Sequence, residues 1–135
     1  MLKEFDILFG GIRKPRLGNS QLLQKAYANG WTLGSTDRNL NFSIPAVRQW
    51  YSEQQLHYHK DGVTFYWNDE GETELFTFYQ WNVAQVATLQ QFDPNLRFFS
   101  INRAFTPGMA RLGAALWTGD ITVEWANLRG SPGYV

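Results

Sequence analysis

The sequence predicts an α/β fold in which parallel β-strands alternate with α-helices. Short runs rich in β-branched and aromatic residues alternate with longer segments of helical pattern along the chain. The clearest strand, Val63–Trp67, has the length and residue types of a strand that is apolar on both faces, as in parallel sheets flanked by helices. Polar residues follow three of the predicted strands. Right-handed crossovers between parallel strands would bring these polar ends to one edge of the sheet.

The chain begins with a short strand and a short helix. Phe5–Phe9 has strand composition, and we expect the glycine pair Gly10-Gly11 to end it. A loop should follow, and then a helix over Ser20–Ala28, whose leucines and alanine can share one face. Asn29-Gly30 supplies the left-handed stop typical of a helix C-terminus. The polar segment Trp31–Asn41 is predicted to be irregular.

A longer helix is predicted from Pro45 to about His59. The fixed φ of proline suits the first helical position, and its missing N–H costs nothing there. Trp50 and Tyr51 repeat at helical spacing with the other apolar residues, so we expect them to pack against the sheet. His57 and His59 would point about 200° apart on a helix, which prevents them from sharing a metal ion. We expect both histidine side chains to be solvated.

The second half of the chain continues the alternation. The remaining predicted elements are a helix over Thr73–Gln91, a strand over Arg97–Asn102, a helical turn opened by Pro107-Gly108, a strand over Ala114–Trp117 and a helix over Val123–Leu128. A complete (β/α)8 barrel needs about 200–250 residues, whereas this chain has 135. The sequence therefore predicts a partial TIM (β/α)8 barrel.

The composition excludes several kinds of partner and site. The 12 basic and 12 acidic residues give zero net charge, so no overall field attracts nucleic acid or an anionic membrane. The chain has no cysteine, which excludes disulfides and thiolate metal sites, and no run approaches the ~20 apolar residues of a membrane span. Six tryptophans suit stacking against sugar rings. Arg13, Lys14 and Arg16 form the one dense basic cluster, which a surface loop explains better than a phosphate site.

Acidic residues follow two of the predicted strands. Asp69, Glu70 and Glu72 come just after the second strand, and Asp120 comes shortly after the fourth. Ligands of α/β barrels bind at the carboxyl ends of the strands. We therefore expect the two groups of acids at one edge of the sheet, at the ends of neighbouring strands. For the first group, an acidic turn exposed to solvent is the alternative.

Two carboxylates with aromatic and basic neighbours are what glycoside cleavage requires. One acts as a nucleophile and the other as an acid and then a base, ~5–5.5 Å apart when anomeric configuration is retained. Such a pair needs neither a metal ion nor an organic cofactor. The residues expected around the pair are Trp67, Arg103, Trp117 and Trp125. From spacing alone, buried or solvated acids with a structural role remain the alternative.

Three blocks of sequence carry a resemblance to a known family. The block Trp67-Asn68-Asp69-Glu70-Gly71-Glu72 resembles a strand ending Trp-x-Asp-x-x-Glu. The block Arg103-Ala104-Phe105, a Pro107-Gly108 turn, Trp117-Thr118-Gly119-Asp120 and then Trp125 resembles Arg-x-x-Phe, a turn, Trp-x-Gly-Asp and a later Trp. Upstream, the segment 40–51 looks like Leu-Asp-Phe-x-Asn-Pro-x-x-Arg-x-Trp-Trp. Over roughly Gly30 to Gly130 the chain resembles glycoside hydrolase family 31, the α-glucosidase and α-xylosidase family.

The resemblance implies two catalytic residues. Asp69 aligns with the nucleophile of the family, which forms a glycosyl-enzyme ester, and Asp120 aligns with its general acid/base. Asp69 must then be ionised, which needs hydrogen-bond donors or a cation. Asp120 must hold a proton, which apolar walls such as Trp117 would favour.

The resemblance also implies substrate-binding residues. Arg103 matches an arginine that contacts substrate hydroxyls, and a salt bridge from Arg103 to Asp69 or Glu72 is compatible with that role. Trp67 and Trp117 match walls of the sugar pocket, and Glu72 completes the expected substrate-binding set. The sequence departs from the family pattern at Asn41, Ile44, Gly71 and Ile121.

The function implied is that of a retaining α-glycosidase acting on α-linked glucosides or related oligosaccharides, without cofactor or metal. An α-transglycosylase using the same pair and a non-catalytic carbohydrate-binding remnant are the alternatives. The first and last barrel strands and the N-terminal β-sandwich of the family have no counterpart in the chain. We therefore expect residues 1–135 to be a fragment of a (β/α)8 catalytic domain, incomplete at both ends, whose partners are the missing parts of its own barrel and the β-sandwich. In isolation the fragment should be poorly soluble and inactive.

Overall fold

Four parallel strands lie side by side in the order in which they occur along the chain. The strands are β1 (Phe9–Arg13), β2 (Val63–Asn68), β3 (Ser100–Asn102) and β4 (Ala114–Leu116). Their register pairs Trp67 of β2 with Ile101 of β3, and Ile101 with Ala115 of β4. The computed structural model describes residues 7–71 and 74–130. Parallel strands connected through helices confirm the predicted α/β class and are consistent with a partial barrel.

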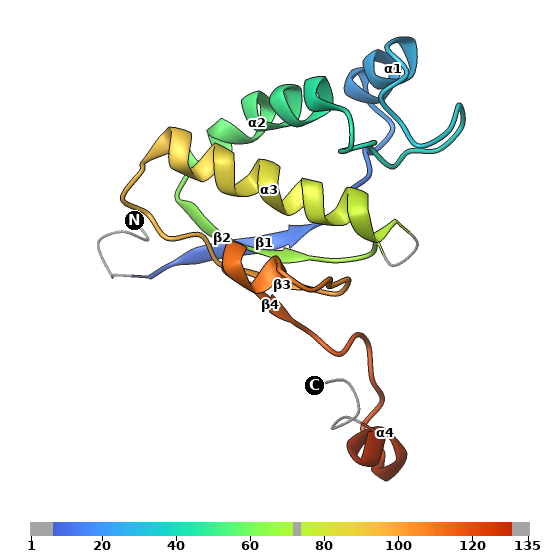
Figure 1. Ribbon diagram of the computed structural model, residues 1–135, viewed down its shortest axis with the longest axis vertical. Coiled ribbons are helices and arrows are strands. Elements are labelled where there is room, and N and C mark those ends of the chain that lie inside the picture. Colours follow the sequence, from blue (N-terminus) through green and yellow to red (C-terminus); the bar gives the residue numbers. More distant parts are fainter. Residues whose placement is uncertain (1–6, 72–73, 131–135) are drawn as a thin grey trace.

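Two long helices, α2 (Pro45–Lys60) and α3 (Leu75–Phe92), lie together on one face of the sheet (Figure 1). The shorter helices are α1 (Gln21–Ala28), the 3-10 helix η2 (Met109–Leu112) and α4 (Trp125–Gly130). The hydroxyl of Ser20 caps α1 by accepting a hydrogen bond from the backbone N–H of Leu23, and Pro45 begins α2 as predicted. Figure 1 shows α4 apart from the sheet and from the other helices.

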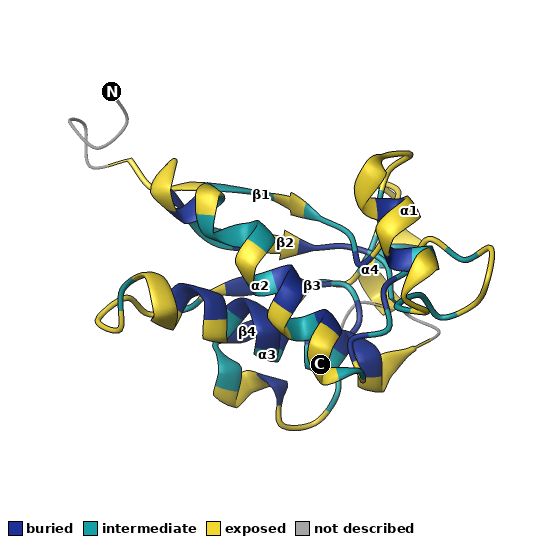
Figure 2. Cartoon of the chain, turned by 90° about the horizontal axis from the view of Figure 1, so that it is seen from above, coloured by how far each residue is buried: buried dark blue, intermediate teal, exposed yellow. Residues whose placement is uncertain are grey.

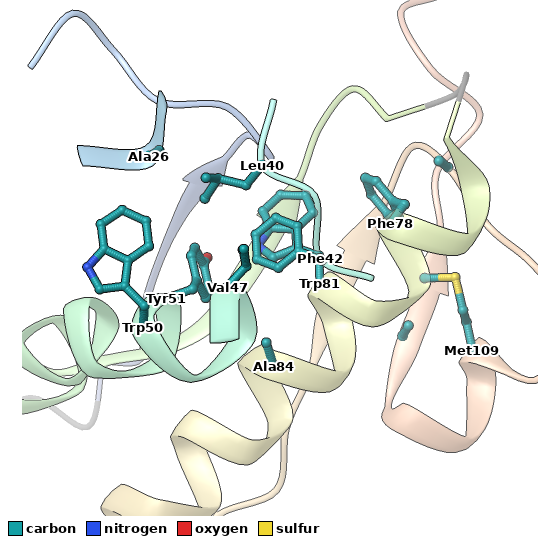
Figure 3. Close-up of a cluster of buried hydrophobic side chains, with 12 residues drawn as sticks. Ala26, Leu40, Phe42, Val47, Trp50, Tyr51, Phe78, Trp81, Ala84 and Met109 are labelled. Carbon is teal, nitrogen blue, oxygen red and sulfur yellow. The ribbon is translucent and has the colours of Figure 1, made fainter. Parts of the chain in front are cut away.

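The core lies between α2, α3 and the segment that precedes α2 (Figure 3). Phe42 of that segment packs edge-on against Tyr51, with ring centroids 5.0 Å apart, and stacks on Trp81 at 6.0 Å. Trp81 and Phe78 meet edge to face at 5.1 Å. Trp50 and Tyr51 are both buried. The sequence predicts that they pack against the sheet, but the ring of Trp50 lies 5.1 Å from that of Trp31, which is outside the strands. Figure 2 shows α2 exposed on one side, whereas α3 is buried or half-buried over most of its length and exposed mainly at its two ends.

The first strand differs from the prediction. The sequence predicts that Gly10-Gly11 ends a strand over Phe5–Phe9, but β1 begins at Phe9 and continues through both glycines. Residues 1–6 lie outside the described ranges. The ring of Phe65 in β2 packs directly on Gly10, where an added Cβ would lie 2.2 Å from Cε2 of that ring. Glycine here makes room for a neighbouring side chain and does not end the strand.

His59 is buried, which contradicts the expectation that its side chain is solvated. Only 2% of the residue is exposed, and its Nδ1 and Nε2 lie 2.8 Å from the carbonyl oxygen of Val63 and 3.0 Å from the hydroxyl of Tyr66. Burial lowers the pKa of His59. The hydrogen bond to Val63 opposes this effect and the charge of Arg13 reinforces it. The last turn of α2 therefore packs on β2, and the histidine ties the two elements together.

Other elements occupy the predicted places with shifted ends. β3 begins at Ser100 instead of Arg97, because its pairing with β2 starts there, and α4 begins at Trp125 instead of Val123. Thr73, the predicted start of α3, lies outside the described ranges. Among the residues that the structure describes, no helix combines the length and apolarity needed to cross a bilayer.

Candidate active site

Alternation along the strands places the site on the face of the sheet that α2 and α3 do not cover. Tyr66 and Asn68 of β2 face the helices, since Tyr66 bonds to His59 of α2 and Asn68 bonds to Gln85 of α3. Successive strand residues point to opposite faces, so Trp67 lies on the other face, where 41% of it is exposed. The residues that follow the parallel strands meet at the same carboxyl edge.

Asp69, Arg103 and Asp120 form a chain of ion pairs at this edge. Nη1 of Arg103 donates to Oδ1 of Asp69 at 2.9 Å, and Nη2 donates to Oδ2 of Asp120 at 3.1 Å. The side chain of Asp69 is 9% exposed, whereas that of Asp120 is 77% exposed. One guanidinium thus contacts both carboxylates. The expectation that the acids follow neighbouring strands is wrong, because β3 lies between β2 and β4 and supplies the arginine.

A second group of charges lies on the β1 side of Asp69. Nζ of Lys14 lies 3.0 Å from Oδ2 of Asp69 and 2.6 Å from Oε1 of Glu70, and Nη2 of Arg16 lies 2.8 Å from the same Glu70 oxygen. From the sequence, a surface loop explains this basic cluster better than a phosphate site. Lys14 and Arg16 do follow β1 in a loop, but the pairing of β1 with β2 brings them to the acids after β2.

The pKa of Asp69 is lowered despite its burial. Burial alone would raise this pKa, because it disfavours the charged form. Hydrogen bonds from Lys14 and Arg103, the backbone N–H of Glu70 and the charge of Lys14 outweigh that effect and lower the pKa of Asp69. Two cations from opposite sides therefore hold the carboxylate in its ionised form.

Trp67 and Trp117 form an aromatic wall beside Arg103. Their rings meet edge to face with centroids 5.1 Å apart, and Cζ of Arg103 lies 5.3 Å from the centroid of Trp117. The sequence led us to expect that apolar walls such as Trp117 would surround Asp120. In the structure Trp117 packs on Arg103, while Asp120 is largely solvated and paired with the guanidinium.

The loop after β2 makes a turn through two left-handed residues, Glu70 with φ 66° and Gly71 with φ 91°. A Cβ on Gly71 would lie 2.0 Å from Cδ2 of Phe78 in α3. Asparagine tolerates a left-handed φ, but the ring of Phe78 occupies the space that an asparagine side chain would need. This contact accounts for Gly71 at a position where the family pattern has Asn.

Buried polar side chains lie directly behind the charged residues. They are Asn68, Asn82, Gln85, Ser100 and Asn102. Nδ2 of Asn68 lies 2.7 Å from Oε1 of Gln85 and 3.0 Å from Oδ1 of Asn102, and Oδ1 of Asn68 accepts from Nε2 of Gln85 at 2.9 Å. Asn68 precedes Asp69 and Asn102 precedes Arg103. The network therefore connects the bases of both charged loops to α3.

Two expected residues do not belong to the described site. Glu72 lies outside the described ranges, and its role in substrate binding stays a prediction. Trp125 is 75% exposed on α4, apart from the sheet (Figure 1). In residues 7–71 and 74–130, no three or more His, Asp or Glu side chains gather in a group that could hold a metal ion.

The family follows from a comparison with known sequences. Residues 16–133 match the model described as the TIM-barrel domain of glycosyl hydrolases family 31. The chain belongs to glycosyl hydrolase family 31. This family 31 chain is 26% identical to neutral alpha-glucosidase AB of Dictyostelium discoideum over 130 residues, which cover 74% of the chain and 14% of the relative. It is 27% identical to human neutral alpha-glucosidase C over 119 residues, which cover 67% of the chain and 13% of the relative.

A solved structure supports the same fold. The family 31 chain superimposes on a family 31 dextranase from Flavobacterium johnsoniae, which was solved as a mutant in complex with isomaltotriose, with a TM-score of 0.71 and 19% sequence identity. The match covers 88% of the chain and 20% of the dextranase. The chain thus spans a small part of the length of the relatives that it matches, and its sheet corresponds to part of a barrel.

Sequence reasoning missed two parts of this family 31 site, the contact of Lys14 with Asp69 and the buried network around Asn68. The signal for Lys14 was its place just after the first strand, at the same edge as the acids. The signal for the network was a polar residue at the end of each of two strands, Asn68 and Asn102, in otherwise apolar positions.

Proposed function

We propose that the chain is part of the (β/α)8 catalytic domain of a retaining α-glycosidase, with Asp69 as the nucleophile and Asp120 as the general acid/base. Membership of glycosyl hydrolase family 31 and relatives named as alpha-glucosidases support this class of reaction. The observation that supports Asp69 and Asp120 as a working pair is that the guanidinium of Arg103 contacts both carboxylates. We use "complete domain" for the catalytic barrel to which residues 1–135 contribute.

In the first step, Asp69 attacks the anomeric carbon of the sugar while the carboxyl group of Asp120 gives its proton to the leaving glycosidic oxygen. The C–O bond to the leaving group breaks and an ester between the sugar and Asp69 forms. An ionised Asp69 is what this step needs, and the lowered pKa of Asp69 supports the assignment. In the second step, the Asp120 carboxylate takes a proton from water, and the water oxygen replaces Asp69 on the anomeric carbon.

Arg103 positions Asp69, and its ion pair with Asp120 breaks when the substrate enters. Its contact with Asp69 is largely shielded from solvent, whereas its contact with Asp120 is exposed. Exposed ion pairs contribute only about 0–1 kcal/mol, so an entering sugar can displace the guanidinium from Asp120 at little cost. Arg103 then remains bound to Asp69.

The aromatic wall of Trp67 and Trp117 suits a pyranose substrate. Ring faces of tryptophan pack on the C–H faces of sugars. The ring of Trp117 lies beside Arg103, and the ring of Trp67 lies against Trp117. We therefore propose α-linked glucosides or related oligosaccharides as the substrate class.

Substitution of each aspartate in the complete domain tests the proposal. Asp69→Ala should abolish turnover of an aryl α-glucoside and leave sugar binding measurable by calorimetry. Asp120→Ala should impair cleavage of an α-linked disaccharide much more than release of an acidic phenol, because a good leaving group needs no protonation. Asp61→Ala, at the exposed end of α2, is the matched control and should keep full activity. Unchanged turnover in Asp69→Ala would refute the assignment.

Product analysis distinguishes the two alternatives. A transglycosylase would pass the glycosyl group to a sugar hydroxyl when acceptor is in excess, whereas a hydrolase releases free sugar. A carbohydrate-binding remnant would bind sugar in calorimetry without turnover.

A further inference from the structure

We propose that Lys14 is a positioning residue for Asp69, which holds Oδ2 of the carboxylate from the β1 side while Arg103 holds Oδ1 from the β3 side. The inference rests on the proposed function only where Asp69 is named as the nucleophile. The two cations reach the carboxylate at 3.0 and 2.9 Å. They come from the loops after the two strands that flank β2, so the carboxylate is fixed from both sides.

Lys14 is itself held in place. Its ammonium lies 2.6 Å from Oε1 of Glu70, which also accepts a contact at 2.8 Å from Arg16. Glu70 takes a left-handed backbone conformation that is uncommon for a residue with a side chain. In this conformation its carboxylate meets both cations. A lysine side chain is flexible, and the second contact to Glu70 restricts it to the geometry that also reaches Asp69.

The backbone fixes the distance between the two loops. The backbone N–H of Asp69 donates to the carbonyl oxygen of Arg13 at 2.9 Å, and Arg13 directly precedes Lys14. The pairing of β1 with β2 thus extends to the residues that carry the ion pair. This register fixes the position of Lys14 next to Asp69. The position of Arg103 is fixed in the same way, because its backbone N–H donates to the carbonyl oxygen of Asn68 at 2.9 Å.

Lys14 and Arg103 have different tasks. Arg103 divides its charge between Asp69 and Asp120, and the contact with Asp120 must change when a sugar enters. Lys14 contacts Asp69 and Glu70, on the side away from Asp120. It can therefore keep Asp69 ionised until it attacks the sugar, and can hold it in the same orientation.

The test is a titration of Asp69 in the complete domain by carboxyl 13C NMR. Among the described residues, the charged groups that face Asp69 are Lys14, Arg103 and Glu70, with Asp120 beyond Arg103. Removing an opposite charge at this distance raises the pKa of a carboxyl. Lys14→Met should lower the acid dissociation constant of Asp69 about tenfold, and Lys14→Arg should restore most of it. Lys60→Met removes an exposed lysine at the end of α2 and should leave Asp69 unchanged.

A reciprocal measurement covers the case in which Lys14→Met does not fold. Hydrogen bonds to Glu70 and Asp69 raise the pKa of Lys14. Asp69→Asn should therefore lower the pKa of Lys14, because coupling between two sites is mutual. If Asp69 titrates as in the wild type in a folded Lys14→Met variant, or if Lys14 titrates unchanged in Asp69→Asn, the inference is overturned.

The pH dependence of kcat/KM adds a measurement that substitution of a merely structural lysine would not change. The acidic limb of the kcat/KM profile reports the ionisation of Asp69 in the free enzyme. In Lys14→Met this limb should move to higher pH, and in Lys60→Met it should stay. Failure of the proposed function would look different, since Asp69→Ala would keep its turnover while both NMR titrations still reported on the ion pair.

Discussion

Replacing Asn68 by leucine should strongly destabilise the fold, because the substitution opens a buried polar network. Asn68 is fully buried and shares two hydrogen bonds with Gln85, one with Asn102 and one with Asn82. In Asn68→Leu, Oε1 and Nε2 of Gln85 and Oδ1 of Asn102 each lose this hydrogen bond. Oδ1 of Asn82 still accepts from the hydroxyl of Ser100. Each buried polar group left without a partner costs about 1–3 kcal/mol. Burial of the leucine side chain offsets part of that sum, on the order of 1–2 kcal/mol.

The expected loss in free energy of unfolding is about 3–6 kcal/mol. Urea denaturation of the complete domain, followed by tryptophan fluorescence, measures it. Thr88→Val, on α3, is the control. Thr88 is equally buried, but its hydroxyl bonds to the carbonyl oxygen of Ala84 within α3, so this change should cost about 1 kcal/mol.

A double-mutant cycle tests the reasoning itself. Asn68→Leu leaves the amide of Gln85 without its partner, and Gln85→Leu leaves the amide of Asn68 without its partner. The double variant removes both amides together. The double variant should therefore be more stable than the sum of the single changes predicts, by about 2 kcal/mol. Additivity within about 0.5 kcal/mol would refute the claim that the amides form one network.

Two further predictions concern burial and the open sheet. Because the folded state holds His59 at a lowered pKa, protons bind preferentially to the unfolded state below about pH 6.5. Stability should therefore fall as the pH drops from 6.5 toward 5, with a smaller slope in His59→Gln, as urea midpoints at each pH would report. In the isolated chain the uncovered face exposes Ile12 and Trp67 and the edge strands β1 and β4 lack outer partners among the described residues, so sedimentation should detect self-association, and a monomeric, cooperative melt would contradict the fragment interpretation.

Local sequence was enough to predict the secondary structure and its order. Pro45 and the apolar spacing that follows it predict α2, and the run from Val63 predicts β2, because helix starts and buried strands depend on neighbouring residues. The alternation of these elements predicts parallel strands and hence one edge for Asp69, Arg103 and Asp120. The sequence blocks around these residues predicted the family, which the match over residues 16–133 confirms.

Tertiary structure alone decided which residues meet at that edge. The register of β1 on β2 brings Lys14 to Asp69, and β3 inserts Arg103 between the two acids. The same packing buries His59 against β2 and turns the Gly10-Gly11 pair into part of a strand. Most of these contacts join residues far apart in sequence, whereas His59 meets Val63 and Tyr66 across the turn between α2 and β2. Each depends on the side chain that the neighbouring strand or helix places opposite, which composition and periodicity along one segment do not contain.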